Sequence, residues 1–226
     1  MKLQKKVQTM LEERKQRAKR LIKKLRTLFP EAEMALKYSS NWELLVAVVL
    51  SAQCTDKMVN KVTEKLFKKY KKLDDYVNAD IEEFEQDIRS TGFYRMKAKN
   101  VLAGAKVVKN TFGGKIPKTI EDLITIPGVG RKTANVVLGN AFGIVEGIAV
   151  DTHVKRFSIR FDLTDNKTPE KIEKDLMELL PKKDWFDFTY LAIEYGRHIA
   201  PARKYDTTQD PLISIYPKAV EGWHKG

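Results

Sequence analysis

The sequence predicts an all-α fold, and three observations support this. No segment of the 226 residues alternates apolar and polar side chains with the period of a half-buried strand. Many segments instead place apolar residues three and four positions apart, as one face of a helix does. The segments between them are short, which favours a compact helical bundle. The length suffices for one large domain or two small ones with buried cores.

The N-terminal segment predicts a long basic helix. Apolar residues follow helical spacing from Val7 to Phe29 with a gap at Arg14, and Pro30 ends the pattern. Residues 1–30 hold eleven basic and two acidic residues and so carry most of the net charge of +12. This basic face is either a solvated surface or a surface that attracts nucleic-acid phosphates. A membrane-surface helix is disfavoured because the apolar stripe contains no Trp.

Helical patterns continue to the C-terminal tail. Asn41 is a candidate N-cap for a helix whose residues 44–50 are all apolar, which predicts a central, buried helix. The pair Thr168-Pro169 is typical of a helix start. The tail from Ala200 contains three prolines and is expected to be mostly irregular. Further helices are expected at residues 55–67, 80–89, 95–110, 119–125, 131–142, 169–180 and 184–198, with a turn at 90–94.

The composition excludes several classes of protein. One cysteine allows no internal disulfide and no site that needs several thiolates. No apolar run approaches the roughly 18 residues that a membrane span needs. The first residues lack the apolar stretch of a secretory signal. These observations predict a cytoplasmic protein whose partner is polyanionic.

Residues 124–135 carry the strongest local signal. They contain Pro127-Gly128-Val129-Gly130 between two expected helices. The glycines allow a tight turn and a close approach of the backbone to a ligand. The next helix begins with unpaired N–H groups and the positive end of its dipole, which favour an anion. The segment therefore predicts a helix–hairpin–helix that grips a nucleic-acid phosphate, and the alternative is a glycine-rich connection without a ligand.

Four sequence blocks follow one another at spacings typical of one family. They are Leu50-Ser51-Ala52-Gln53-Cys54-Thr55-Asp56, Thr91-Gly92-Phe93-Tyr94 with Lys97-Ala98, the hairpin with Lys132-Thr133-Ala134-Asn135-Val136-Val137, and Val150-Asp151-Thr152-His153. In these blocks the chain resembles the endonuclease III branch of the helix–hairpin–helix DNA glycosylases. The resemblance implies two all-α lobes. One would be a six-helix barrel of residues 37–145, and the other would combine residues 1–36 with residues 146–226.

The resemblance implies that Lys132 and Asp151 are catalytic. The family's lysine attacks C1′ of the sugar and displaces the damaged base, and β-elimination of the resulting Schiff base nicks the strand 3′ to the lesion. Lys132 lies at a helix start, where the dipole favours the neutral, nucleophilic amine. Asp151 would stabilise positive charge that develops on the sugar. Plainer interpretations are a phosphate contact beside Arg131 for Lys132 and a helix N-cap for Asp151.

Other matching positions are expected to contact DNA once the target base leaves the stack. The resemblance assigns Gln53 to fill the vacated space and Phe93 to wedge between bases, where Leu is common in the family. Phosphate contacts are expected at Gly128, Gly130, Arg131, Thr133 and His153. The alternatives are a buried loop anchor for Phe93, a polar residue at a helix C-terminus for Gln53 and a structural hydrogen bond for His153.

The chain departs from the family at its cofactor. Most relatives carry four cysteines near the C-terminus that hold a [4Fe–4S] cluster. Ungapped alignment from Gly196-Arg197 places Ala200, Thr207, Asp210 and Tyr216 at those positions, and none supplies a thiolate. We therefore expect no cluster and no resident metal, with the tail held by Ile213, Ile215, Tyr216 and Trp223. A monovalent cation held by the hairpin carbonyls, as in this superfamily, is compatible with the sequence.

The expected function is that of a bifunctional DNA glycosylase and abasic-site lyase of base excision repair, acting on oxidised pyrimidines in duplex DNA. Adenine-mismatch relatives carry a catalytic glutamate where this chain has Ala47, which argues against adenine removal. One alternative is a monofunctional glycosylase for mismatched or alkylated bases, although such relatives usually lack the lysine. Another is a non-catalytic DNA-binding module. A monomer associated with the nucleoid is expected, with no membrane partner.

Overall fold

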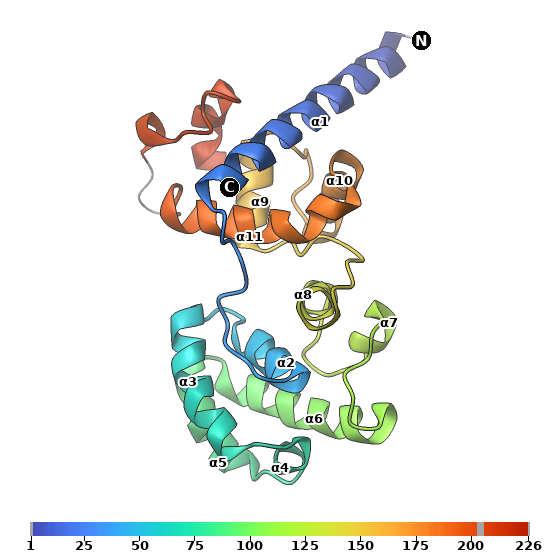
Figure 1. The fold of residues 1–226 in the computed structure, drawn as a ribbon, viewed down its shortest axis with the longest axis vertical. Helices are drawn as coiled ribbons and strands as arrows, with labels where there is room; N and C mark the ends of the chain where they lie inside the picture. Colours follow the sequence, from blue (N-terminus) through green and yellow to red (C-terminus); the bar gives the residue numbers. More distant parts are fainter. Residues whose placement is uncertain (1, 203–205, 226) are drawn as a thin grey trace. The chain divides into compact units, whose positions relative to one another are not determined.

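The chain divides into two compact units (Figure 1). The computed structural model describes residues 2–202 and 206–225, with the side chains of residues 4, 8–202 and 206–221. Unit 1 joins two segments, Met1–Glu33 and Gly147–Gly226, and unit 2 is continuous from Met34 to Glu146. All regular structure in the described residues is helical, which confirms the predicted fold class. No described helix is both long and apolar enough to cross a membrane.

Unit 2 is built around α2 (Asn41–Leu50). Its residues 44–50 are all buried, and it packs against α3, α6 and α8, so the prediction of a central, buried helix is confirmed. A 3-10 turn, η1 (Arg89–Thr91), precedes α6. The remaining helices are α3 (Asp56–Lys69), α4 (Leu73–Val77), α5 (Ile81–Ile88), α6 (Tyr94–Phe112), α7 (Ile120–Leu123) and α8 (Arg131–Phe142).

The start of α2 differs from the sequence prediction by one residue. Ser40, rather than Asn41, is the N-cap, and its hydroxyl accepts the N–H of Glu43 at 3.2 Å. The Glu43 carboxylate in turn accepts the N–H of Ser39 at 2.6 Å. The contact from Glu43 back to Ser39 favours Ser40 over Asn41 as the N-cap, because this contact holds the extended residues that precede the helix.

Unit 1 combines an N-terminal helix with helices from the end of the chain. The N-terminal helix α1 (Lys2–Leu28) packs against α10 (Pro169–Leu179) and α11 (Lys182–His198), and α9 (Thr152–Arg160) packs against α11. The tail is more ordered than the sequence predicts, since it forms the 3-10 segments η2 (Thr207–Gln209) and η3 (Pro217–Lys225). Segments of this kind have no α-helical periodicity for a sequence pattern to reveal.

The gap in the apolar stripe of α1 is a buried arginine that pairs with two more exposed carboxylates. Arg14 is 9% exposed, and its guanidinium binds Asp165 through two contacts of 2.8 Å and Asp162 through one of 2.6 Å. These hydrogen bonds lower the pKa of Asp165. Arg14 thus helps to hold α1 against the rest of unit 1. Four other cations are exposed and make no ion pair in the described part of the chain: Lys19, Arg20, Lys23 and Lys24.

Candidate active site and DNA-binding elements

A tight hairpin joins α7 to α8 in unit 2. Ile126 and Val129 are buried and anchor it, and the N–H of Val129 donates to the carbonyl of Ile126 at 3.0 Å. Gly128 has a φ of +83°, a left-handed backbone that glycine adopts most easily. Gly130 is the N-cap of α8 and makes no side-chain capping bond. The hairpin therefore leaves the positive end of α8 available to an anion.

Gly128 and Gly130 are expected to respond differently to alanine. A Cβ on Gly128 would lie 2.9 Å from the Cβ of Asn100, on a left-handed backbone. Gly128→Ala should therefore lower the free energy of unfolding by about 1–3 kcal/mol. A Cβ on Gly130 meets nothing within 4 Å, so Gly130→Ala is the matched control. It should change stability by less than about 0.5 kcal/mol. Urea unfolding of both variants measures this, and equal losses would contradict it.

Lys132 is exposed in the first turn of α8, two residues after its N-cap. Within the described part of the chain its ammonium makes no hydrogen bond or ion pair. Arg131 is also exposed, and Thr133 is half-buried. Ala134 and Asn135, on the next turn, are buried and fix the helix in unit 2. An accessible primary amine at an anion-binding helix end can act as a nucleophile or as a phosphate contact.

Asp151 is the N-cap of α9 in unit 1, which confirms the simpler of its two interpretations. Its Oδ1 accepts the N–H groups of His153 and Val154, both at 2.8 Å. Its Oδ2 has no hydrogen-bond partner among the described residues, and the side chain is only half-buried. The cap fixes the orientation of the carboxylate and leaves one oxygen for a ligand. Capping and catalysis are therefore compatible roles for this side chain.

His153 packs against the backbone of α11. A Cβ built on Gly196 would lie 2.2 Å from its Nδ1, so the ring occupies the space that a larger residue would fill. The Nη2 of Arg156 also lies 3.3 Å from the same nitrogen. These contacts give His153 a structural role, and its contact with a phosphate stays a prediction.

The two residues expected to enter the duplex both have left-handed backbones in exposed turns of unit 2. Gln53, between α2 and α3, has a φ of +53°, and Phe93, at the start of α6, has a φ of +48°. Phe93 is 66% exposed, so the buried-anchor interpretation is wrong. Gln53 lies beyond the last residue of α2, and it is also exposed. A left-handed backbone costs about 1–3 kcal/mol for such residues and is typical of functional sites.

The sequence assigned no role to Lys97, which lies in α6 close after the Phe93 turn. Its side chain is buried, at 4% exposure. Its spacing could have revealed this burial, because Lys97 lies on the same face of α6 as the buried Val101 and Val108. A lysine at such a position is unusual, because its charge needs polar partners inside the protein.

The residues at the family's cluster positions do not fit an iron–sulfur cluster. Ala200 offers no ligand atom. Asp210 already binds protein groups, because Oδ1 accepts the N–H of Leu212 and Oδ2 accepts the hydroxyl of Tyr195. Cys54, the single cysteine, belongs to unit 2. Among the described residues no group of three or more His, Cys, Asp or Glu could hold a metal ion.

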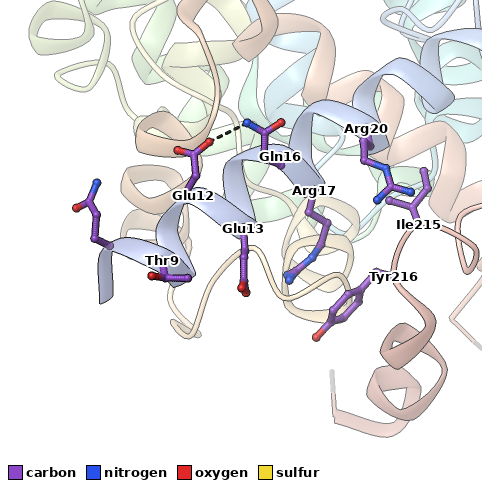
Figure 2. Close-up of a pocket in the computed structure, with 9 residues that line it drawn as sticks. Thr9, Glu12, Glu13, Gln16, Arg17, Arg20, Ile215 and Tyr216 are labelled. Carbon is purple, nitrogen blue, oxygen red and sulfur yellow. Dashed lines mark hydrogen bonds between the residues drawn. The ribbon is translucent and has the colours of Figure 1, made fainter. Parts of the chain in front are cut away.

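The last of these positions, Tyr216, borders a surface groove of unit 1 instead. The groove has a volume of about 790 Å³ and lies between α1 and the tail (Figure 2). The guanidinium carbon of Arg17 lies 4.0 Å from the centre of the Tyr216 ring. None of the predicted site residues lines this groove. The lining residues are Gln8, Thr9, Glu12, Glu13, Gln16, Arg17, Arg20, Ile215 and Tyr216.

The helical fold, the hairpin and the uncapped helix that carries Lys132 together define a helix–hairpin–helix DNA repair protein. The family model of the HhH-GPD superfamily of base excision DNA repair proteins matches residues 46–182. This match spans both the hairpin and Asp151.

Individual relatives narrow the assignment. The endonuclease III of Synechocystis sp. (strain ATCC 27184 / PCC 6803 / Kazusa) is 46% identical over 206 residues, which cover 91% of this chain and 94% of the relative. Two solved structures are 41% identical, with a TM-score of 0.87 and coverage of 92% of this chain and 97% of theirs. One is a non-covalent endonuclease III–DNA complex and the other a trapped endonuclease III–DNA covalent intermediate. The chain belongs to the endonuclease III family.

Proposed function

We propose that this chain is a bifunctional DNA glycosylase and abasic-site lyase that removes damaged bases from duplex DNA. The observation that carries the proposal is Lys132, an exposed amine with no ion-pair partner among the described residues, at the start of an uncapped helix. A related endonuclease III has been trapped as a covalent intermediate with DNA. Lys132 gives this chain a nucleophile for the same kind of bond.

In the proposed reaction the neutral amine of Lys132 attacks C1′ of the damaged nucleotide. The bond between C1′ and the base breaks, and the base leaves with the electron pair and takes up a proton. The lysine nitrogen then gives up one proton, the bond between C1′ and O4′ breaks, and O4′ takes the electron pair and a proton, so that the sugar ring opens to a protonated Schiff base. Elimination then removes a proton from C2′ and breaks the bond from C3′ to its oxygen, which nicks the strand 3′ to the lesion. The positive end of α8 holds a phosphate nearby.

Asp151 supplies the negative charge in this proposal. The sugar gains positive charge as the base departs, and a fixed carboxylate stabilises it without having to reorient. The N-cap bonds to His153 and Val154 hold Oδ1 in place, so Oδ2 is the oxygen that faces the sugar. The same oxygen can accept a proton during ring opening.

The remaining predicted residues bind DNA in this proposal. Gln53 fills the space left by the flipped base, Phe93 wedges between bases, and Gly128, Gly130, Arg131, Thr133 and His153 contact phosphates. We propose oxidised pyrimidines as the substrate class. Ala47, where adenine-mismatch relatives carry their glutamate, is fully buried in α2 and can do no chemistry. A monovalent cation at the hairpin carbonyls stays a prediction.

We further propose that the chain works without an iron–sulfur cluster and that side chains hold its tail instead. The Asp210 side chain is completely buried, and its Oδ2 lies 3.6 Å from Nη2 of Arg160. Burial and the neighbouring Asp210 raise the pKa of Tyr195, so its hydroxyl stays protonated and donates to that carboxylate. Leu212 is fully buried, and Ile213, Ile215 and Tyr216 pack against the same core, as expected from the sequence. The side chain of Trp223 lies outside the described residues.

Removing the buried carboxylate is expected to loosen the tail. Asp210→Ala removes the carboxylate beside the buried guanidinium of Arg160 and the acceptor of the Tyr195 hydroxyl, so the free energy of unfolding should fall by about 3–5 kcal/mol. Asp206→Ala, which removes an exposed carboxylate from the same tail, is the control and should cost much less. Denaturant unfolding measures both, and elemental analysis gives the iron content of the parent. Stoichiometric iron, or an Asp210→Ala protein as stable as the parent, would overturn the proposal.

Borohydride trapping tests the proposed function. The protein is mixed with duplexes that carry thymine glycol or an abasic site, and reduction captures any Schiff base as a stable adduct. Adducts on both duplexes support glycosylase and lyase activity together. An adduct on the abasic duplex alone would redirect the substrate search to mismatched and alkylated bases. Tight binding without any adduct would favour a monofunctional enzyme or a DNA-binding module.

A further inference from the structure

A buried lysine connects the two turns that carry Gln53 and Phe93. The ammonium of Lys97 donates to the carbonyl of Leu50 at 2.8 Å and to the carbonyl of Thr91 at 2.7 Å. Leu50 precedes Gln53 by three residues, and Thr91 precedes Phe93 by two. One side chain on α6 therefore joins the end of α2 to the end of η1, two backbone segments that lie far apart in the sequence.

The two acceptors explain why a cation is tolerated there. Leu50 is the last residue of α2 and Thr91 the last residue of η1, so both carbonyls lie at helix ends that lack intrahelical partners. The negative end of a helix dipole also favours a cation, and α2 has no basic residue of its own in its last turn. Lys97 therefore caps two helices at once. Thr91 is fixed as well, because its hydroxyl donates to the carbonyl of Ile88 at 2.8 Å.

The turns beyond these carbonyls need to be held. Gln53 and Phe93 are exposed and have left-handed backbones, which relax unless the surrounding structure maintains them. Lys97 reaches the base of both turns. We infer that Lys97 is a positioning residue that fixes the spacing between Gln53 and Phe93, so that both side chains enter the duplex together when the target base is flipped. The inference rests on the proposed function.

The test compares a substrate that needs both turns with one that does not. Lys97→Met keeps an unbranched side chain one atom shorter than lysine and removes all its donors. We expect it to lower single-turnover base excision from a thymine glycol duplex by about 10–100-fold, as small misplacements do. Trapping on a single-stranded abasic site, where no base must be flipped and no space filled, should stay within about twofold. With 2-aminopurine opposite the lesion, the parent should give the rise in fluorescence that reports side-chain insertion into the stack. Lys97→Met should not give this rise.

Controls separate positioning from general damage. Thr63→Val changes another buried polar side chain of unit 2, in α3, and should leave the ratio of the two rates unchanged. Lys97→Arg, which keeps the charge and the donors, should restore part of the excision rate. Phe93→Ala combined with Lys97→Met should lose less excision than the product of the two separate losses, because part of the effect of Lys97 acts through Phe93. If circular dichroism shows that Lys97→Met is unfolded, Lys97→Gln takes its place.

Two results would overturn the inference. Equal losses on the duplex and on the single strand would mean that Lys97 only supports the fold, and an unchanged duplex rate would mean that it has no role. A parent protein that forms no adduct on either substrate would instead refute the proposed lysine chemistry. The two failures are therefore distinguishable in one set of reactions.

Discussion

Replacing Lys132 with alanine is expected to abolish the borohydride-trapped adduct and to lower strand cleavage at a lesion by at least about 10³-fold, as loss of a nucleophile does. The amine is the atom that bonds to C1′, and no neighbouring side chain can replace it at that position. Because Lys132 is exposed and makes no ion pair among the described residues, its loss should leave the fold intact. The measurement is the amount of adduct on an abasic duplex, alongside a thermal melt.

Lys57 provides a matched control for this substitution. It is exposed and lies two residues after the N-cap of α3, the same position that Lys132 has in α8. Lys57→Ala removes an equivalent charge from an equivalent helix start, and at saturating enzyme it should still give full adduct. An adduct that persists in Lys132→Ala would show that another amine is the nucleophile.

Replacing Asp151 with asparagine should separate its two roles. Asparagine caps helices about as well as aspartate, so Asp151→Asn should change the free energy of unfolding by less than about 0.5 kcal/mol. It lacks the negative charge that stabilises the sugar, so single-turnover excision should fall by about 10²–10³-fold. Asp151→Ala removes the cap as well and should cost about a further 1 kcal/mol of stability.

The pair of Asp151 variants is measured by urea unfolding and by excision from a thymine glycol duplex. Loss of stability in both variants with unchanged excision would mean that Asp151 is only a cap. Unfolding of Asp151→Asn would mean that the carboxylate charge matters to the fold more than the two N–H contacts indicate.

The sequence predicted the elements that have strong periodicity or strong local chemistry. The apolar run at residues 44–50 identified a buried helix, and the spacing around Gly128 and Gly130 identified the hairpin. Asp151 was recognised as a cap because its residue type and the helix after it agree. The five residues of α4 went unpredicted because they complete little more than one turn and show no period.

Long-range contacts between polar groups had no sequence signal. Arg14 appeared only as a gap in a stripe, because its partners lie about 150 positions further along the chain. The contact between Arg160 and Asp210 spans two segments that no local pattern connects. The left-handed backbones of Gln53 and Phe93 were also invisible, since neither residue type favours that conformation. These features depend on the assembled fold rather than on any window of sequence.

The division of the chain into a continuous and a discontinuous unit has a consequence for biosynthesis. Helix α1 is made first, yet the helices it packs against, α10 and α11, belong to the last part of the chain. Unit 2 is complete in one stretch and can fold while the ribosome is still working. At roughly 5–20 residues per second, the apolar stripe of α1 is made about 10 to 30 seconds before its partners. During that interval the nascent chain exposes the apolar face of a basic helix. A chaperone would act on this segment.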